Sequence, residues 1–422
     1  MNLADDLQVA VTVRSPDLWH LCRDLVAAPS VNPPGDTTGP AAVLFDYLVD
    51  EGHHPSLVSA DPTKPSVVSS IQGRSPGPHL VMNVHLDTMP TGPLDQWSVE
   101  PYELTDRADR WYGLGMGNMK GAAAAMAVAF VLLGERRDQW RGTVTFTAVS
   151  DEVVFGDAGA AHLIATAPEL ADPDGLLCGE GPGFMRLGLA EKGLLWCRVT
   201  AAAEPGHASN ARHGSTAIAR LALALVRLDA LNDTIVELPA DLDAVPVDQV
   251  DARRLSLNIG KVAGGTFIGQ CSTHATAEVD IRIPPGLSLA DVQVLLAEAI
   301  VGIDAVEIET IRGWEPNWTS LAHPLVAAVN GAAAAVRGSA PELSVRLPAS
   351  DASRWRSRGV GAICYGPQPT LSSGIDDYAE SRAVRDCAVV YATAALRFLD
   401  TPPESFPRFS AAGEPDQNES TP

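Results

Sequence analysis

The stretch of sequence that decides the fold is residues 81–90, V-M-N-V-H-L-D-T-M-P. With Leu80 before it, this stretch begins as a short apolar run, which is typical of a strand buried in a parallel sheet. The run leads to His85 and Asp87, and Pro90 then breaks the pattern. An imidazole at a strand end, with a carboxylate two positions later to orient it, is typical of a metal ligand. Candidate functional residues can therefore be judged by whether they act together with His85.

Composition and charge exclude several classes of function. The 422 residues suffice for about two domains, and 46% of them are hydrophobic, as in a globular protein. Asp and Glu number 52 against 30 Lys and Arg, a net charge of -22 that argues against nucleic acid or an anionic membrane as a partner. The apolar run 119–134 is shorter than a typical membrane span, so we interpret it as a buried core helix.

The N-terminus and the cysteines predict a cytoplasmic protein. The first ten residues, M-N-L-A-D-D-L-Q-V-A, lack the basic and apolar regions of a signal peptide. The six cysteines are scattered along the chain without a C-x-x-C pair, which is typical of reduced and mostly buried thiols.

The order of the expected elements predicts an α/β domain that is interrupted by a smaller one. Before residue 190, strands alternate with helices, which indicates a sheet covered by helices on both faces. After it, the order strand–helix–strand–strand–helix with alternating polarity indicates an inserted α+β sandwich. We therefore expect a larger domain at 1–190 and 310–400, an insert at 191–309 and a disordered tail at 401–422. The expected strands are 67–71, 80–84, 143–149, 174–178, 194–200, 255–262, 275–283 and 360–365, and the expected helices are 16–30, 41–51, 119–134, 215–228, 287–301, 325–336 and 383–399.

A series of short motifs occurs in one order along residues 15–400. They read L-V-A-A-P-S-V-N-P-P-G, H-L-D-T-M-P, W-Y-G-L-G-M-G-N-M-K-G, S-D-E-V-V-F-G, C-G-E-G-P, G-H-A-S, V-D-I-R-I-P-P-G, A-S-D-A and Y-G-P. In this order the chain resembles the zinc aminoacylase and carboxypeptidase family, which includes acetylornithine deacetylase, succinyl-diaminopimelate desuccinylase and glutamate carboxypeptidase. The resemblance implies a zinc-exopeptidase-like catalytic domain with a mixed sheet flanked by helices. It also implies an inserted lid domain, through which members often form homodimers.

The resemblance assigns five metal-ligand positions, and only two of them carry the family's residue. His85 and Glu180 match, whereas Asn118 stands where the bridging Asp is expected, Val153 where a Glu is expected and Ser373 where the last His is expected. Two zinc ions would then have one ligating carboxylate instead of three, which leaves their charge poorly compensated. We therefore expect either no metal or one weakly bound divalent ion, such as zinc, on His85, Asn118 and Glu180.

The same resemblance assigns roles to residues outside the ligand set. Glu152 takes the position of the catalytic general base, and Asp87 that of the carboxylate that orients His85. His207 matches the lid histidine that reaches the partner's active site and helps to hold the reacting oxyanion. Arg282 is either a core or rim residue or a clamp for a substrate carboxylate, and Asp351 belongs to the pocket floor.

Some neighbouring residues are left without an assigned role. The family's lid also carries an Asn that grips substrate near a G-G-x-x-x-N motif, but residues 264–271 read G-G-T-F-I-G-Q-C. Asp157, Asp376 and Asp377 are interpreted as solvated loop acids, and Cys178 as a buried thiol.

The sequence predicts an amidohydrolase-like enzyme that acts on an amide or an N-acyl amino-acid-like small molecule. Glu152 would serve as its general acid and base, with the metal site lost or reduced to one weak ion. One alternative is a metal-independent enzyme on the same scaffold that catalyses acyl transfer, amide formation, isomerisation or elimination, for which proton transfer suffices. A second alternative is a pseudoenzyme that binds a ligand without turning it over.

Overall fold

The computed structural model describes residues 3–183, 185–369 and 374–402, which form two compact units. The larger unit contains the chain up to Leu189, Trp318–Ser344 and the chain from Ala349 on. The smaller unit contains Ala190–Asn317 and Val345–Pro348. It extends beyond the expected insert because a strand that the sequence did not indicate, β12 (Val306–Trp314), completes its sheet.

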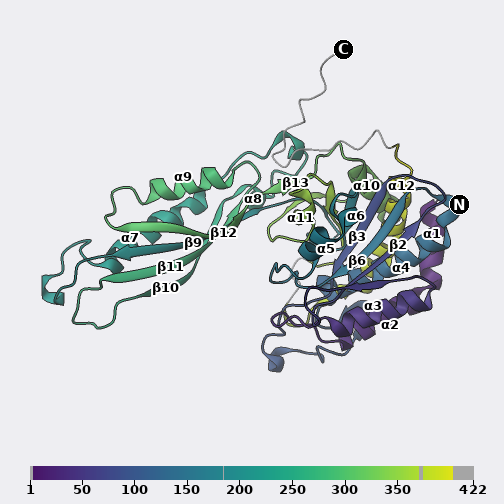
Figure 1. The fold of residues 1–422 in the computed structure, drawn as a ribbon, viewed down its shortest axis with the longest axis horizontal. Helices are drawn as coiled ribbons and strands as arrows, with labels where there is room; N and C mark the ends of the chain where they lie inside the picture. The colour runs from purple at the N-terminus through teal and green to yellow at the C-terminus, as the bar shows by residue number, and fades with distance from the viewer. Residues whose placement is uncertain (1–2, 184, 370–373, 403–422) are drawn as a thin grey trace, which may run out of the picture. The chain divides into compact units, whose positions relative to one another are not determined.

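A nine-stranded mixed sheet forms the centre of the larger unit, with the order β1-β2-β6-β3-β7-β15-β8-β13 and with β14 paired to β8 (Figure 1). The central strands β6, β3, β7 and β15 are parallel, and β2 joins β6 in antiparallel orientation. Register pairs His85 with Val149 and Asn83 with Cys178, so the carboxyl ends of three strands meet at one edge. The strands are β1 (Ser56–Val58), β2 (Ser66–Gln72), β3 (His79–His85), β6 (Thr143–Val149), β7 (Gly175–Cys178), β8 (Leu187–Glu191), β13 (Asn317–Trp318), β14 (Leu343–Arg346) and β15 (Ala362–Cys364).

Helices cover both faces of this sheet, as the alternation of strands and helices predicted (Figure 1). On one face, Leu163, Leu170 and Trp355 of α5, α6 and α11 pack on strand residues such as Val81 and Leu176. On the other face, α4 and α12 contact β3, and α10 packs against α12. The helices are α1 (Leu3–Val13), α2 (Ser15–Ala27), α3 (Thr38–Asp50), α4 (Gly121–Glu135), α5 (Ala160–Thr166), α6 (Pro168–Ala171), α10 (Pro324–Arg337), α11 (Ala352–Arg356) and α12 (Ser381–Leu399).

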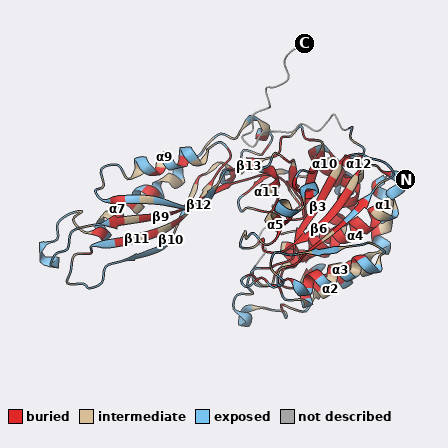
Figure 2. Ribbon diagram, in the orientation of Figure 1, coloured by how far each residue is buried: buried red, intermediate tan, exposed pale blue. Residues whose placement is uncertain are grey.

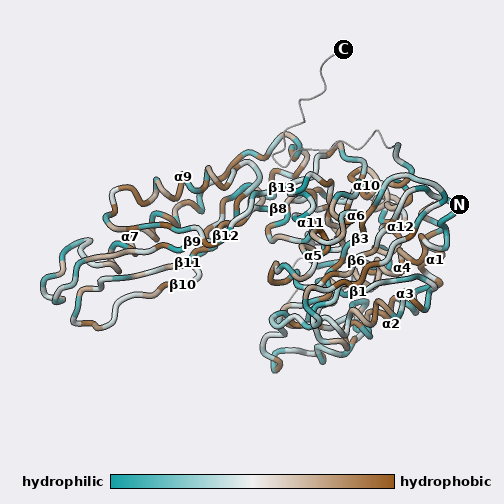
Figure 3. The backbone as a smooth tube through the Cα atoms, viewed as in Figure 1, coloured by the Kyte–Doolittle hydropathy of each residue, from teal (hydrophilic) through white to brown (hydrophobic). Residues whose placement is uncertain are grey.

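The apolar run at 119–134 forms α4, a core helix of the larger unit. The segment Met116–Glu135 is long and apolar enough to cross a membrane, but 94% of its most apolar window is buried inside the protein. Six of the first seven residues of α4 are small, namely Gly121 and five alanines, which lets the helix lie close to its neighbours. Figure 3 shows hydrophobic residues concentrated along the central strands of the same core.

A π-type turn, Met116–Lys120, precedes α4 and carries Asn118 in extended rather than helical backbone geometry. Asn118 is therefore presented from a loop-like segment and not from the side of a helix. Nearby in the sequence, a small antiparallel sheet of β4 (Thr105–Arg107), β5 (Arg110–Tyr112) and β16 (Tyr378–Glu380) was not indicated by any sequence pattern.

The smaller unit is an antiparallel sheet with the order β10-β11-β9-β12, packed against helices α7 and α9. Along β11 the burial alternates residue by residue, and Ala277, Val279 and Ile281 point into the same core as Leu221 of α7 (Figure 2). This is the two-layer α+β arrangement that the sequence predicted for the insert. Its elements are α7 (Ala217–Asp229), α8 (Val250–Arg253), α9 (Leu289–Ala299), β9 (Gly193–Ala202), β10 (Ser256–Gly264), β11 (His274–Ile283) and β12. Among the described residues of both units, 3-10 turns occur at Leu94–Gln96, Arg137–Gln139, Ala208–Asn210, Ala230–Asp233 and Ala240–Leu242.

Candidate active site

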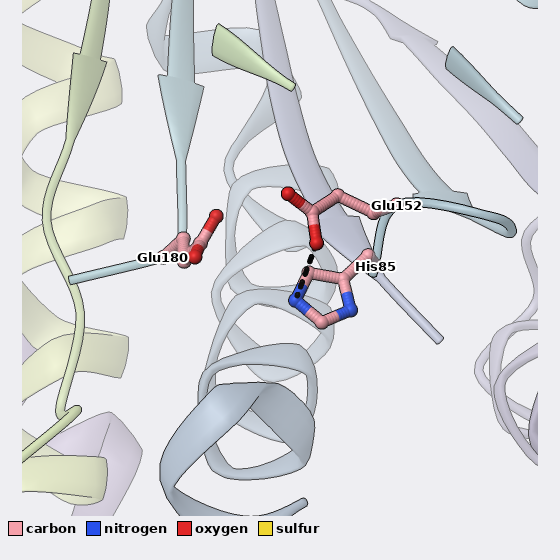
Figure 4. Close-up of side chains that lie close together, drawn as sticks. All are labelled: His85, Glu152 and Glu180. Atoms are coloured by element: carbon pink, nitrogen blue, oxygen red, sulfur yellow. Dashed lines mark ion pairs between the residues drawn. The ribbon is translucent and has the colours of Figure 1, made fainter. Parts of the chain in front are cut away.

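Three side chains with metal-binding or proton-carrying groups meet at the carboxyl edge of the parallel strands. His85 is the last residue of β3, Glu152 follows the end of β6 at Val149, and Glu180 follows the end of β7 at Cys178. The carboxyl ends of parallel strands lie along one edge of a sheet, so residues far apart in sequence are brought together there. Figure 4 shows Glu152 and His85 pointing toward one another, with Glu180 approaching from the neighbouring strand end.

The distances within this cluster are those of a compact polar site. His85 Nε2 lies 3.7 Å from Glu152 Oε2 and 3.4 Å from Asn118 Oδ1. Ligand atoms of His85, Glu152 and Glu180 all lie within 4.8 Å of one another, and the three residues are buried. Within the described ranges this is the one group of three such residues that could hold a metal ion. Glu152, which the sequence assigned to proton transfer alone, thus also lies within reach of an ion.

The main chain of Asp87 fixes the ring of His85. His85 Nδ1 lies 2.9 Å from the main-chain oxygen of Asp87, whereas the Asp87 carboxylate is 3.7 Å away. A carbonyl oxygen can only accept, so Nδ1 carries the proton and the lone pair of the neutral ring is on Nε2. That lone pair faces oxygens of Glu152 and Asn118, so a cation placed between them would be favourable. The Asp87 carboxylate also lies near Nδ1, so its expected role in orienting His85 stays a prediction beside this backbone contact.

The carboxylate of Asp87 also holds the segment that carries Glu152. It accepts hydrogen bonds from the backbone N–H groups of Glu152 (3.1 Å) and Val153 (2.9 Å). It also accepts one from Asn32 Nδ2 (2.8 Å), and the same amide donates to Asp151 Oδ1 (3.1 Å). Asp87 is fully buried, so these three bonds compensate a charge that water cannot reach.

Asp151 anchors the same segment from its other side. Its φ of 64° lies in the left-handed region, which is unfavourable for an aspartate unless side-chain bonds hold it. Lys64 Nζ donates to Asp151 Oδ1 at 2.5 Å. Burial raises the pKa of Asp151, but hydrogen bonds from Lys64, Asn32 and the Ala158 N–H together bring that pKa below its usual value. Asp151 is therefore a charged anchor beside Glu152.

Asp351 lies beneath the floor of the site. It is 2% exposed and receives a long contact from Asn83 Nδ2 at 3.4 Å, while Arg354 Nε lies 3.6 Å from its other oxygen. Burial raises the pKa of Asp351 to about 6, and the nearby charges of Arg354 and His85 oppose that rise. A side chain this deeply buried is suited to shape the pocket floor, and the part that Asp351 plays in substrate binding stays a prediction.

Asp377 was interpreted as a solvated acid, and this interpretation is wrong. Asp377 is buried and accepts the N–H groups of Gly115 (2.9 Å) and Gly117 (3.2 Å), which fixes the turn that leads to Asn118. Burial lowers the pKa of the neighbouring Lys120 to about 7, and the charge of Asp377 opposes that shift. Lys120 donates to the main-chain oxygen of Ala28 at 3.1 Å.

Of the other residues near the ligand positions, Cys178 is buried and Asp157 is almost fully exposed, as expected. Asp376, which was expected as a solvated acid, is half-buried and accepts the N–H of Ser98 at 2.8 Å. Ser373, which stands at the position of the family's last histidine ligand, lies outside the described residues.

His207 and Arg282 belong to the smaller unit. His207 precedes the turn Ala208–Asn210, is exposed, and bonds through Nδ1 to Ser209 Oγ at 2.8 Å. Arg282 on β11 pairs with both carboxylate oxygens of Asp280, at 2.7 Å from Nε and 3.0 Å from Nη2. Two of its donors are thus committed within its own strand, and its use as a substrate clamp stays a prediction.

Comparison with known proteins shows to which family the chain belongs. The profile of peptidase family M20/M25/M40 matches residues 81–397, a range that includes all three residues of the cluster. The chain belongs to peptidase family M20/M25/M40. It is therefore an amidohydrolase- or peptidase-like enzyme of a family that typically depends on metal ions.

Similar sequences carry names of deacylating enzymes. A Staphylococcus epidermidis protein named "probable succinyl-diaminopimelate desuccinylase" is 26% identical over 313 residues, which cover 67% of this chain and 72% of that protein. An acetylornithine deacetylase from Vibrio vulnificus is 27% identical over 320 residues, which cover 71% of this chain and 79% of the relative.

Solved structures confirm the fold class. An M20 family metallo-carboxypeptidase from Sulfolobus solfataricus aligns with a TM-score of 0.71 at 18% identity and covers 91% of this chain and 99% of its own. Human carnosine dipeptidase 1 aligns with a TM-score of 0.72 at 14% identity and covers 95% of this chain and all of its own. These identities are low, so the two likenesses support the M20 fold alone.

Proposed function

We propose that the chain hydrolyses the amide bond of an N-acyl amino-acid-like small molecule, with Glu152 as the group that moves the proton. The observation that carries this proposal is the buried pair of Glu152 Oε2 and His85 Nε2, 3.7 Å apart at the edge of the parallel strands. The names of two relatives, a desuccinylase and a deacetylase, support an N-acyl group as the part of the substrate that is cleaved.

The side chains present do not fit two metal ions. Asn118 offers a neutral amide oxygen where a bridging carboxylate would be needed, and Val153 offers no donor at all. Two divalent ions bring four positive charges, and within the described part of the site the cluster holds two carboxylates to balance them. Buried charges without partners are costly, so no step of the proposed reaction uses a second ion.

One divalent ion does fit the donor set. His85, Glu152 and Glu180 supply one imidazole nitrogen and two carboxylates, which are donors that zinc accepts. When bound, such an ion would polarise the carbonyl of the scissile amide. One oxygen of Glu152 suffices as a ligand, which leaves the other oxygen to accept a proton.

The residues of this chain then act in successive steps of the reaction. Glu152 takes a proton from a water molecule as the water oxygen bonds to the amide carbon, and it returns that proton to the nitrogen as the C–N bond breaks. The products are a carboxylic acid and a free amine. Asp87 and Asp151 keep Glu152 in place through the hydrogen bonds of its segment. His207 is proposed to donate a hydrogen bond to the oxyanion, and Arg282 to hold a substrate carboxylate.

To test the proposal, the protein is incubated with a panel of N-acetyl and N-succinyl amino acids, and the release of free amine is measured by chromatography. Glu152→Gln keeps the shape but cannot accept the proton, so we expect kcat to fall by about 10²–10⁴-fold. Full activity of Glu152→Gln would overturn the role of Glu152. Formation of a new amide or ester instead of hydrolysis would favour the metal-independent alternative. Tight binding without turnover, unaffected by the substitution, would favour the pseudoenzyme.

We further propose that two copies associate through the smaller unit. Strand β10 lies at the edge of its sheet, and its residues from Gly260 to Gly264 are all exposed, Val262 among them. An exposed edge strand is a natural site for pairing with another chain. Sedimentation analysis of Val262→Asp, with Val294→Asp on α9 as the control, tests this: only the first substitution is expected to release monomers.

A cytoplasmic location stays a prediction.

A further inference from the structure

The larger unit contains a cavity of about 320 Å³ that no part of the proposed reaction uses. It lies at the amino ends of the parallel strands, between the turn after β2, the segment before β6 and the end of α12. The candidate active site lies at the opposite ends, and β3 and β6 have seven residues each, which span about 23 Å. The cavity is therefore a separate place in the fold. Its lining residues are Leu3, Arg74, Gln139, Trp140, Arg141, Leu396, Arg397, Leu399 and Asp400.

The lining of this cavity carries a positive charge in a strongly acidic protein. Three of the nine residues are arginines and one, Asp400, is acidic. Three positive charges and one negative charge give the cavity a formal charge of +2, against -22 for the whole chain. Within the described ranges, none of the guanidinium groups of Arg74, Arg141 and Arg397 forms a salt bridge with a carboxylate. Positive charges that share a cavity repel one another, so an anion placed among them would be favourable.

Hydrogen bonds hold together the three segments that carry the arginines. The backbone N–H of Arg74 donates to the main-chain oxygen of Trp140 at 2.9 Å, so the first segment is fixed to the second. The guanidinium of Arg141 donates to the main-chain oxygens of Leu399 (3.3 Å) and Thr401 (2.9 Å), which fixes the second segment to the end of α12. The third arginine lies in the last turn of that helix. The positive charges are thus brought together before a ligand arrives, which lowers the entropy cost of binding.

Trp140 gives the cavity a fixed apolar wall. Its side chain is buried, and its Nε1 donates to the main-chain oxygen of Leu133 at 2.9 Å, which fixes the indole ring. A Cβ added at Gly73 would meet that ring at 2.6 Å, so the glycine lets the turn after β2 approach the indole closely. Leu399, which is also buried, belongs to the same lining. A ligand that reaches these two side chains would gain by burying apolar surface.

We propose that this cavity binds a small organic phosphate, with the phosphate group among the arginines and the carbon part against Trp140. A phosphate group carries a charge of about -1.5 to -2 near pH 7 and three acceptor oxygens. It therefore matches both the formal charge of the cavity and the forked donors of the guanidinium groups. A carboxylate carries only one negative charge, so it compensates the arginines less completely.

The experiment compares three anions by isothermal titration calorimetry. The full-length protein is titrated with phenyl phosphate, benzoate and inorganic phosphate at one ionic strength, which is set with sodium chloride. We expect phenyl phosphate to bind about tenfold more tightly than benzoate, a factor that corresponds to ~1.4 kcal/mol. No binding of phenyl phosphate, or equal or tighter binding of benzoate, would overturn the proposal. Inorganic phosphate that binds as tightly as phenyl phosphate would contradict the contact between Trp140 and the carbon part of the ligand.

Substitutions show whether the phosphate binds at this cavity. Arg74→Gln and Arg397→Gln each remove one charged donor and should weaken the binding of phenyl phosphate by about tenfold or more. Asp400→Asn removes the carboxylate of the lining and should strengthen binding by about two- to fivefold. Arg107→Gln on β4 removes the same charge outside the cavity and should leave the affinity unchanged. Undiminished affinity in both arginine variants of the cavity would overturn the proposal. Calorimetry needs no turnover, so the result does not depend on the proposed hydrolysis.

Discussion

Replacement of Asn32 by alanine should destabilise the larger unit and displace Glu152. Asn32 is 2% exposed, and its amide nitrogen donates to two carboxylates, Asp87 Oδ2 at 2.8 Å and Asp151 Oδ1 at 3.1 Å. Both carboxylates hold the segment that carries Glu152. Alanine removes both bonds at once and leaves an empty volume between two buried negative charges.

The size of the effect follows from these two contacts. A buried hydrogen bond to a charged group contributes about 1.5–3 kcal/mol. Asp151 keeps Lys64, and Asp87 keeps two backbone N–H groups, so the lower end applies and the loss for Asn32→Ala is about 3 kcal/mol in total. At roughly 2–4 °C per kcal/mol, the melting temperature of this unit should fall by about 6–12 °C.

The assay is thermal unfolding followed by circular dichroism, with steady-state kinetics on any substrate found in the amine-release panel. We expect kcat to fall more than KM rises, because a displaced Glu152 affects proton transfer rather than binding. Asn210→Ala is the control, since Asn210 is exposed and its side chain makes no hydrogen bond within the described ranges. A melting temperature of Asn32→Ala within 2 °C of the wild type would refute this account of the segment.

Two further predictions concern buried charges, and a third concerns the metal site. Burial raises the pKa of Asp351 to about 6, so the unfolded chain releases this proton at a lower pH than the folded chain. The free energy of unfolding should therefore fall as pH rises from about 4 to 6, and Asp351→Asn should flatten this slope in urea denaturation. Burial lowers the pKa of Lys120 to about 7, so the unfolded chain keeps this proton up to a higher pH than the folded chain. The free energy of unfolding should therefore rise between about pH 7 and 10. Lys120→Met should remove that rise, and an unchanged slope would contradict the burial argument. The double substitution Asn118→Asp with Val153→Glu restores two carboxylates and should add a second zinc equivalent in calorimetric titration, whereas unchanged stoichiometry would show that other residues limit the site.

The elements that the sequence predicted well are those with strong hydrophobic periodicity. The strand at 143–149 was expected at the residues where β6 occurs, and β3 extends the expected strand by one residue at each end. The strands that were missed are short or mostly exposed. In β12 the burial pattern is largely exposed and gives no alternation to recognise, and β4, β5 and β16 have three residues each.

The candidate site was predictable only in part, because some of its residues act through side-chain contacts with distant parts of the chain. His85, Glu152 and Glu180 each follow a recognisable strand, and parallel strand ends necessarily meet at one edge. Asn32 and Asp377 act through side-chain contacts with residues far away in the sequence. The bond from Asn32 to Asp151 spans 119 residues, and the bond from Gly115 to Asp377 spans 262. One sequence contains no signal for such pairs, although Asn32 does lie within the S-V-N-P-P-G motif.

Metal stoichiometry tests the central claim most directly. The full-length protein is dialysed against zinc, freed of excess metal, and analysed by elemental mass spectrometry alongside Glu180→Gln. The donor set of His85, Glu152 and Glu180 predicts at most one zinc ion per chain, and it predicts that Glu180→Gln loses any zinc that the wild type binds. Two zinc ions per chain in the wild type, or an undiminished zinc content in Glu180→Gln, would contradict the account.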